Sequence, residues 1–319
     1  MRKKFQLFKG VAFTATLLLL LAACNKKDLF FNPKALGNTE KKTIAELVKQ
    51  SPEHSFLFAA VEKAGLAGTL SGAGTFTVFA PTNDAFRAAG FPTVQSVRNA
   101  PADVLKGILL YHVLGSVVFA KDVQGLNAAP VTTLAQKDFY VTGKGGRVWV
   151  NNARVTTADI KAKNGVIHVI DKVLLPPSQN LVQLAQSNAN LSTLVAAVLQ
   201  LGEPTISTLA SGGPFTVMAP TNEAFGKLLV ALNKTSLPEI DNGLLATVLT
   251  YHLIPGRVFS YNLSEGLEAP TVQGGKLTFS LMGGPKVKGN GNASASNILA
   301  VDILGTNGVV HVIDQVLLP

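Results

Sequence analysis

The stretch NGVIHVIDKVLLP, residues Asn164–Pro176, returns almost unchanged as NGVVHVIDQVLLP at Asn307–Pro319. Each copy begins with an Asn-Gly pair typical of a turn, continues as an apolar run interrupted by His and Asp, and ends at a proline. The pattern predicts a turn followed by a long buried strand, over Val166–Leu175 in the first copy. Two such endings predict two domains, and we expect the second fold to be complete at the last residue.

Two further motifs recur in the same order. FTVFAPTNDAF at Phe76–Phe86 matches FTVMAPTNEAF at Phe215–Phe225, and a Tyr-His pair at 111–112 matches one at 251–252. The offsets between copies drift slowly, which indicates a few inserted residues within one topology. Solenoid repeats have periods of about 20–50 residues, so this longer period marks whole domains.

Hydrophobic spacing within each copy predicts an α+β fold. Apolar residues at helical spacing open each copy, a Gly-rich turn follows, and β-branched and aromatic residues then predict a strand. In APTNDAF the proline stops the strand and Thr82 or Asn83 can cap a helix. We expect further helices at Val104–Leu110 and Leu244–Thr250, and strands in the first copy at Val117–Phe119, Phe139–Thr142, Arg147–Val150 and Arg154–Val155.

Two glycine-rich segments call for separate interpretation. The second copy contains GGPKVKGNGNASASNILAVDI, residues 283–303, where the first has a shorter segment. Its Gly and Ser content predicts a mobile loop. The run GKGG at 143–146 lacks the strand-to-helix context of a phosphate-binding loop and is interpreted as a hairpin turn.

Composition and charge limit the class of partner. The 319 residues are 47% hydrophobic and 15% charged, which is typical of globular domains. The net charge of +9 divides into +4 for residues 1–23, +1 for 24–40, +6 for 41–177 and −2 for 178–319. The basic residues of 41–177 are scattered and Trp149 is the sole tryptophan, whereas nucleic-acid binders cluster Lys and Arg among aromatic residues. We therefore expect no nucleic-acid partner.

The first 23 residues have the pattern of a secretion signal. A basic segment precedes the apolar run Val11–Ala23, which is too short to span a bilayer. The sequence Leu-Ala-Ala-Cys at 21–24 resembles the lipobox of bacterial lipoproteins, in which the thiol of the first mature residue is lipidated. We therefore predict a lipoprotein signal peptide at 1–23 and a lipidated Cys24; an ordinary signal peptide with an incidental cysteine is the alternative.

Cys24 is the single cysteine, so an intramolecular disulfide and a cysteine-based zinc cluster are excluded. Residues 24–40 are mostly polar, and Pro33 and Gly37 interrupt any regular element, so the segment is expected to form a flexible spacer. In bacterial lipoproteins an Asp after the lipidated cysteine resembles an inner-membrane retention signal, and this chain has Asn25. That resemblance favours the outer membrane and does not distinguish the cell surface from the periplasmic face.

FTVFAPTNDAF, Tyr-His and NGVIHVIDKVLLP together resemble the signature blocks and the central Tyr-His motif of the fasciclin (beta-Ig-H3) domain. The resemblance covers both repeats, at residues 41–177 and 178–319. It implies an α+β fold in which a wedge-shaped β-sandwich is flanked by short helices, in secreted and surface-anchored proteins that mediate adhesion. The segment 283–303 is a departure of the second copy from the first.

Four histidines fall at repeated positions and are the sharpest candidates for a site: His112, His168, His252 and His311. No G-x-S-x-G elbow accompanies them, so nucleophilic catalysis has no recognisable partner. His168 and Asp171 lie three apart in a predicted strand and should face opposite sides, and His311 and Asp314 repeat that spacing. The favoured role is structural, each histidine bonding a backbone or carboxylate group at a helix-to-sheet junction, with surface binding and metal or catalytic roles as alternatives.

The Tyr-His motif carries a second implication of the resemblance. In animal members the motif and its neighbours are implicated both in integrin-type adhesion and in core stability. The resemblance therefore supports a junction role first and a contact role second for Tyr111, His112, Tyr251 and His252.

We expect a non-enzymatic, exported, lipid-anchored protein of the cell envelope that requires no cofactor or metal. Its partners would be the membrane, through the lipid, and a surface or matrix protein or polysaccharide. A periplasm-facing accessory protein that binds another envelope component is the second hypothesis, and a hydrolase acting on matrix polymer is the third.

Overall fold

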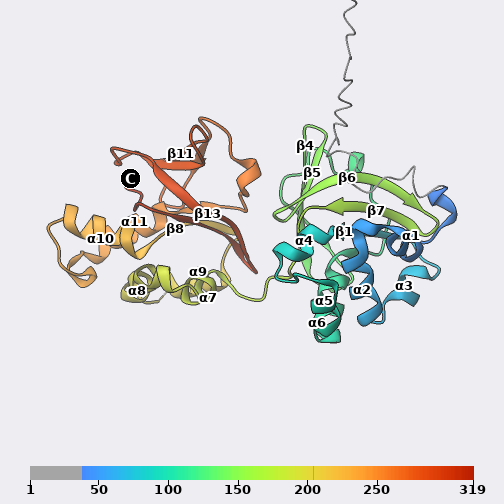
Figure 1. Cartoon of the computed structure of the whole chain (residues 1–319). Coiled ribbons are helices and arrows are strands. Elements are labelled where there is room, and N and C mark those ends of the chain that lie inside the picture. The colour runs from blue at the N-terminus through green and yellow to red at the C-terminus, as the bar shows by residue number, and fades with distance from the viewer. Residues whose placement is uncertain (1–37, 204) are drawn as a thin grey trace, which may run out of the picture.

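A computed structural model describes residues 38–203 and 205–319. Two successive halves each contain a seven-stranded sheet with helices on one side, so the predicted α+β fold with two tandem domains is confirmed (Figure 1). The predicted signal peptide, Cys24 and most of the predicted spacer lie outside the described residues. Within the described part of the chain, no helix is both long and apolar enough to cross a membrane.

The first domain opens with three short helices, and three more follow its first strand. A side-chain cap starts several of them: Thr43 accepts from the backbone N–H of Glu46, and Thr82 accepts from that of Ala85, as predicted for APTNDAF. The helices are α1 (Ile44–Gln50), α2 (Ser55–Lys63), α3 (Ala67–Ser71), α4 (Asn83–Ala88), α5 (Val94–Asn99) and α6 (Ala102–Tyr111).

The first sheet has the order β2-β1-β7-β6-β5-β4-β3. The pair β1–β7 is parallel and every other neighbouring pair is antiparallel. The strands are β1 (Phe76–Pro81), β2 (Val113–Leu114), β3 (Ala129–Thr132), β4 (Asp138–Lys144), β5 (Arg147–Val150), β6 (Ala153–Ala162) and β7 (Gly165–Ile170).

The second domain repeats this topology in the order β9-β8-β14-β13-β12-β11-β10, with β8–β14 as its parallel pair. Its helices are α7 (Leu181–Gln186), α8 (Ser192–Leu201), α9 (Thr205–Ser211), α10 (Asn222–Ala231) and α11 (Asn242–Tyr251). Its strands are β8 (Phe215–Pro220), β9 (Leu253–Pro255), β10 (Glu268–Pro270), β11 (Lys276–Ser280), β12 (Lys286–Gly289), β13 (Ser296–Gly305) and β14 (Gly308–Ile313).

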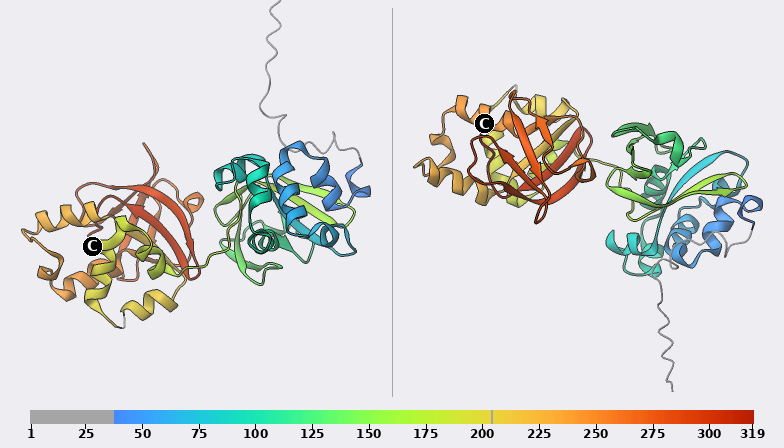
Figure 2. Two further views of the ribbon diagram at one scale, coloured as in Figure 1. Left: turned by 60° about the horizontal axis from the view of Figure 1, so that its bottom comes forward. Right: turned by 90° about the horizontal axis from the view of Figure 1, so that it is seen from above.

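The long strand β6 gives the first domain its sandwich form. It pairs with β5 through Ala153 and Arg154, and with β7 along the rest of its length. One apolar core fills the space between the two parts of the sheet, around Phe79, Phe139 and Ile170. A second core lies between the sheet and the helices, which Figure 2 shows gathered on one side. The second domain has the same pair of cores.

Several predicted elements differ from the structure. Residues Val117–Phe119 form a loop rather than a strand, and the predicted strand Val166–Leu175 ends at Ile170. The segment 283–303 is not a mobile loop, because it supplies β12 and most of β13. Val287 and Ile298 are buried in the core, and the backbone is paired on both sides, β12 with β11 and β13, and β13 with β12 and β14. Few apolar residues therefore suffice to hold the strands.

The Asn-Gly turn before β7 fixes where the closing strand begins. A side chain at Gly165 would place its Cβ 2.0 Å from the carbonyl oxygen of Phe76, so only glycine fits there. The Asn164 side chain accepts from the N–H of Ile44 at 2.9 Å and donates to the carbonyl of Leu70 at 2.9 Å. It therefore joins the start of α1 and the end of α3 to the closing strand. Asn307 does the same in the second domain.

The two domains meet through aromatic side chains. Trp149 of β5 stacks on Tyr261 with ring centroids 4.9 Å apart and an interplanar angle of 14°. The Arg257 guanidinium lies 3.9 Å from the ring centroid of Tyr140 on β4. Such contacts are favourable beyond the area they bury, so they restrict the interdomain angle together with the linker prolines.

Replacing Asn164 tests how much its side-chain hydrogen bonds contribute to stability. Asn164→Ala should lower the free energy of unfolding of the first domain by about 1–3 kcal/mol, because it strands the N–H of Ile44 and the carbonyl of Leu70. Urea denaturation followed by circular dichroism measures the change. The exposed neighbour is the control: Lys163→Ala should change stability by less than about 0.5 kcal/mol. Equal stability of the two variants would show that the hydrogen bonds of Asn164 contribute nothing to the stability of the first domain.

Candidate functional site

The Tyr-His motifs lie at the ends of α6 and α11, where the chain passes from helix to sheet. The Tyr111 hydroxyl donates to the carbonyl of Asp138 at 2.8 Å and accepts from Nδ2 of Asn151 at 3.1 Å. The Tyr251 hydroxyl donates to the carbonyl of Lys276 and accepts from the N–H of Asn290 at 3.0 Å. Both tyrosines are fully buried, which leaves no exposed surface for a partner.

The histidine of each motif ties its helix to the end of the domain. Nδ1 of His112 donates to the carbonyl of Ile108 at 2.8 Å, and Nε2 accepts from the N–H of Leu174 at 2.9 Å. His252 repeats the arrangement with the carbonyl of Val248 and the N–H of Leu317. A ring that donates at one nitrogen and accepts at the other is neutral, and these partners specify the Nδ1–H tautomer.

Burial keeps these two rings uncharged. It lowers the pKa of His112 and that of His252 to about 4, although the hydrogen bond from each ring to a backbone carbonyl acts in the opposite direction. Each side chain is 1% exposed. A general base needs a pKa near the working pH and contact with substrate, and neither ring meets these conditions.

The second pair of histidines lies on the closing strands and uses the other tautomer. Nε2 of His168 donates to the carbonyl of Val118 at 2.8 Å, and Nδ1 accepts from the N–H of Asp159 at 3.1 Å. His311 bonds the carbonyl of Val258 and the N–H of Asp302 in the same way. Burial lowers the pKa of both rings. All four repeated histidines thus bond backbone groups on separate segments of their domain.

Asp159 and Asp302 join this network and were not singled out from the sequence. Each has a positive φ, 59° and 61°, at an irregularity in β6 or β13. Asp159 accepts from the N–H of Ala120 at 2.8 Å, and Asp302 accepts from the N–H of Ser260 at 2.7 Å. The repeated Asp-Ile pairs at 159–160 and 302–303 were the available signal.

The aspartates that follow the closing strands lie apart from the histidines. Asp171 accepts from the N–H of Arg154 at 2.8 Å. Asp314 accepts from the N–H of Asn297 at 2.8 Å and from the hydroxyl of Ser296 at 2.9 Å. Burial raises the pKa of Asp314, but the hydrogen bonds from Asn297 and Ser296 outweigh it, so the net pKa is lowered. These carboxylates fasten β6 and β13 to the chain beyond the closing strand.

The network has little capacity for chemistry. Across residues 38–203 and 205–319, no group of three His, Cys, Asp or Glu side chains is placed to hold a metal ion. The histidines, tyrosines and aspartates described above direct their polar atoms at backbone and side-chain groups of their own domain. They hold the helices, the sheet and the loops of each domain together.

Each half of the chain thus defines a class of α+β domain in which a parallel strand pair is fixed by buried asparagine and histidine side chains. The family described as the Fasciclin domain matches residues 52–176 and again 189–319. The chain belongs to the fasciclin family.

Relatives occur in animals and bacteria. The chain is 33% identical over 253 residues to the transforming growth factor-beta-induced protein ig-h3 of Oryctolagus cuniculus, covering 78% of this chain and 35% of that protein. It is 46% identical over 136 residues to protein sll1483 of a Synechocystis strain, covering 42% of this chain and 74% of that protein. The chain therefore spans about a third of the length of the rabbit relative.

Among solved structures, a domain pair from the insect cell adhesion molecule fasciclin I matches with a TM-score of 0.40 and 21% sequence identity. The match covers 83% of this chain and 96% of that one.

The buried neutral histidines make stability depend on pH. The folded pKa values of His112 and His252, about 4, lie below the ordinary value of 6.5, so the unfolded chain binds protons first as the pH falls. Their contribution is complete above pH 6.5 and is lost towards pH 4. Each domain should lose at least about 1 kcal/mol of unfolding free energy between pH 7.5 and 5.5, measured by urea denaturation. A flat profile would show that the rings are already accessible to protons.

The strand histidines are tested one domain at a time. His168→Ala should destabilise the first domain and His311→Ala the second, each by about 1–3 kcal/mol, because a backbone carbonyl and an N–H lose their partner. Differential scanning calorimetry of each variant reports the domain that melts earlier. Melting of both variants at the wild-type temperatures would show that these rings contribute nothing to the folded state.

Proposed function

We propose that this chain is a lipid-anchored protein of the bacterial cell envelope that acts without catalysis, binding a surface or matrix protein or polysaccharide through its two fasciclin domains. One observation carries the proposal. In both copies the side chains best suited to chemistry are spent on bonds to backbone groups, so the outer surfaces of the domains remain for recognition. Membership of the fasciclin family supports the same role.

The anchor is proposed from the sequence at residues 21–24. A diacylated cysteine would hold the protein at the membrane, since each buried methylene contributes about 0.8 kcal/mol and two chains suffice for stable attachment. The segment between Cys24 and the first described helix would then separate the domains from the bilayer surface. Asn25 supports placement in the outer membrane.

Labelling of cells with a radioactive fatty acid tests the anchor. The wild-type protein should carry the label and remain with the membrane fraction, whereas Cys24→Ser should be unlabelled. An unlabelled wild-type protein would contradict lipidation.

Protease treatment of intact cells then tests exposure, and adherence of a deletion strain tests function. Cleavage on intact cells together with loss of adherence, restored by the wild-type gene but not by Cys24→Ser, is the expected result. Protection from protease with unchanged adherence would reject the surface role and favour a periplasm-facing accessory protein that binds another envelope component.

A further inference from the structure

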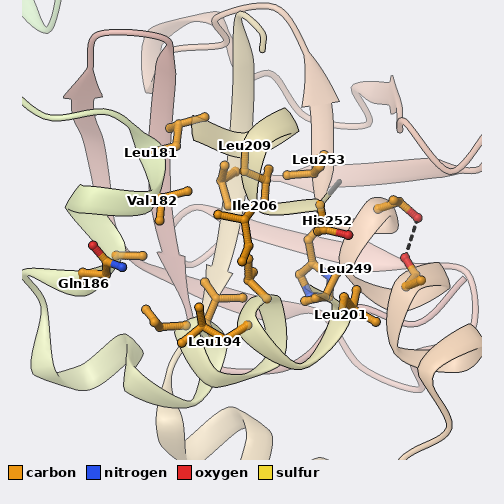
Figure 3. Close-up of a pocket in the computed structure, with 18 residues that line it drawn as sticks. Leu181, Val182, Gln186, Leu194, Leu201, Ile206, Leu209, Leu249, His252 and Leu253 are labelled. Atoms are coloured by element: carbon orange, nitrogen blue, oxygen red, sulfur yellow. Dashed lines mark hydrogen bonds between the residues drawn. The ribbon is translucent and has the colours of Figure 1, made fainter. Parts of the chain in front are cut away.

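The two domains differ in an apolar groove between their helices and their sheet. In the second domain it is bounded by α7, α8, α9, α11 and β8 and has a cavity volume of about 110 Å³. Figure 3 shows Leu181 and Val182 on one side of this groove, Leu249 and Leu253 on the other, and Ile206 between them. The corresponding space in the first domain has a cavity volume of only about 20 Å³.

Two differences between the copies contribute to this difference in volume. The backbone N–H of Leu134 bonds the carbonyl of Val113, and that of Val272 bonds the carbonyl of Leu253, so Leu134 and Val272 occupy the same place in the two folds. Leu134 lines the space in the first domain, whereas Val272 is 44% exposed and lies away from the groove.

The residue before each Tyr-His motif changes in the same sense. It is Leu110 in the first domain and Thr250 in the second, and both line the space. The first domain therefore fills this space with its own leucines, and the second leaves it open.

The chemistry of the groove wall restricts what can enter. Its lining residues are mainly Leu, Val, Ile and Ala, with the uncharged polar side chains of Gln186, Thr205, Thr250 and the neutral His252, and none is Asp, Glu, Lys or Arg. Both ring nitrogens of His252 are already bonded, and the Thr250 hydroxyl donates to the carbonyl of Ala246 at 2.7 Å. An ionised head group would find no counter-charge here, so an uncharged hydrocarbon group fits best.

We propose that the groove of the second domain is a binding site for the hydrocarbon chain of an uncharged lipid or similar apolar small molecule. A wall of mainly aliphatic side chains gains free energy from burying such a chain. An apolar cavity of about 150 Å³ in another protein holds benzene, so this cavity takes a short length of chain, and the open end lets the remainder extend outward. The site is separate from the proposed adhesion role and does not rest on it.

A homologous series of alcohols measures the site. The fragment 38–319 contains the described residues of all four apolar cores, so it serves as the protein for isothermal titration calorimetry with 1-hexanol, 1-octanol and 1-decanol. Affinity should rise about fourfold, or about 0.8 kcal/mol, for each added methylene that the groove buries, and should level off once the chain extends beyond it. Decanoate at pH 7.5 should bind no more tightly than decanol. Methyl signals of Ile206, Leu209 and Leu249 should shift in NMR spectra, while those of the first domain should not.

Paired variants locate the binding. Ala246→Phe places a ring in the groove and should weaken decanol binding at least tenfold, whereas Ala196→Phe on the exposed side of α8 should leave it unchanged. Val195→Gln, which puts an amide in the groove wall, is the second test if Ala246→Phe does not fold. Absence of binding, equal binding by Ala246→Phe and Ala196→Phe, or dimerisation that Ala246→Phe abolishes would each overturn the proposal, the last because a second copy would then occupy the groove.

Discussion

Each domain depends on how the backbone polar groups around its closing strand are satisfied. Asn164 or Asn307 holds two helix ends at the start of that strand, His168 or His311 holds a loop and β6 or β13 at its middle, and His112 or His252 holds the chain beyond its end. A hydrogen bond adds only about 1 kcal/mol on average, but a stranded buried partner costs about 1–3 kcal/mol. These side chains therefore determine which arrangement of helices and sheet is allowed more than they add to total stability.

This constraint also separates what the two copies share from what they vary. Both keep the asparagines and histidines that bond these backbone groups, the parallel strand pair and the buried Tyr-His motif. They differ in surface charge, in the length of the segment that forms β12 and β13, and in whether leucines fill the space beneath the helices. Functional differences between the domains should therefore arise from exposed faces and from the groove of the second domain, because changes within the buried hydrogen-bond network would destabilise the domain that contains it.

The sequence predicted the elements whose signals are local. The repeated motif order predicted two domains, and APTNDAF predicted a capped helix after a strand. The GKGG run predicted a hairpin turn, in which Gly145 and Gly146 have positive φ. The strands in 283–303 were missed because they are held by pairing with strands outside the segment, β12 with β11 and β13 with β14, rather than by a local apolar pattern. The N–H partner of His112 lies 62 residues away and the carbonyl partner of His168 lies 50 residues away, which spacing alone cannot reveal. The groove was missed because it results from a smaller side chain and a displaced one in the second domain, and no sequence motif marks it.

The histidine tautomers test this network of buried hydrogen bonds most directly. Long-range ¹H–¹⁵N spectra of the fragment 38–319 at pH 6 should show the four repeated histidines as neutral rings, with His112 and His252 protonated at Nδ1 and His168 and His311 protonated at Nε2. Each assignment follows from the carbonyl that its ring faces, so these four histidines must divide into two of each tautomer. Averaged signals that titrate near pH 6.5, as exposed histidines do, would contradict the account.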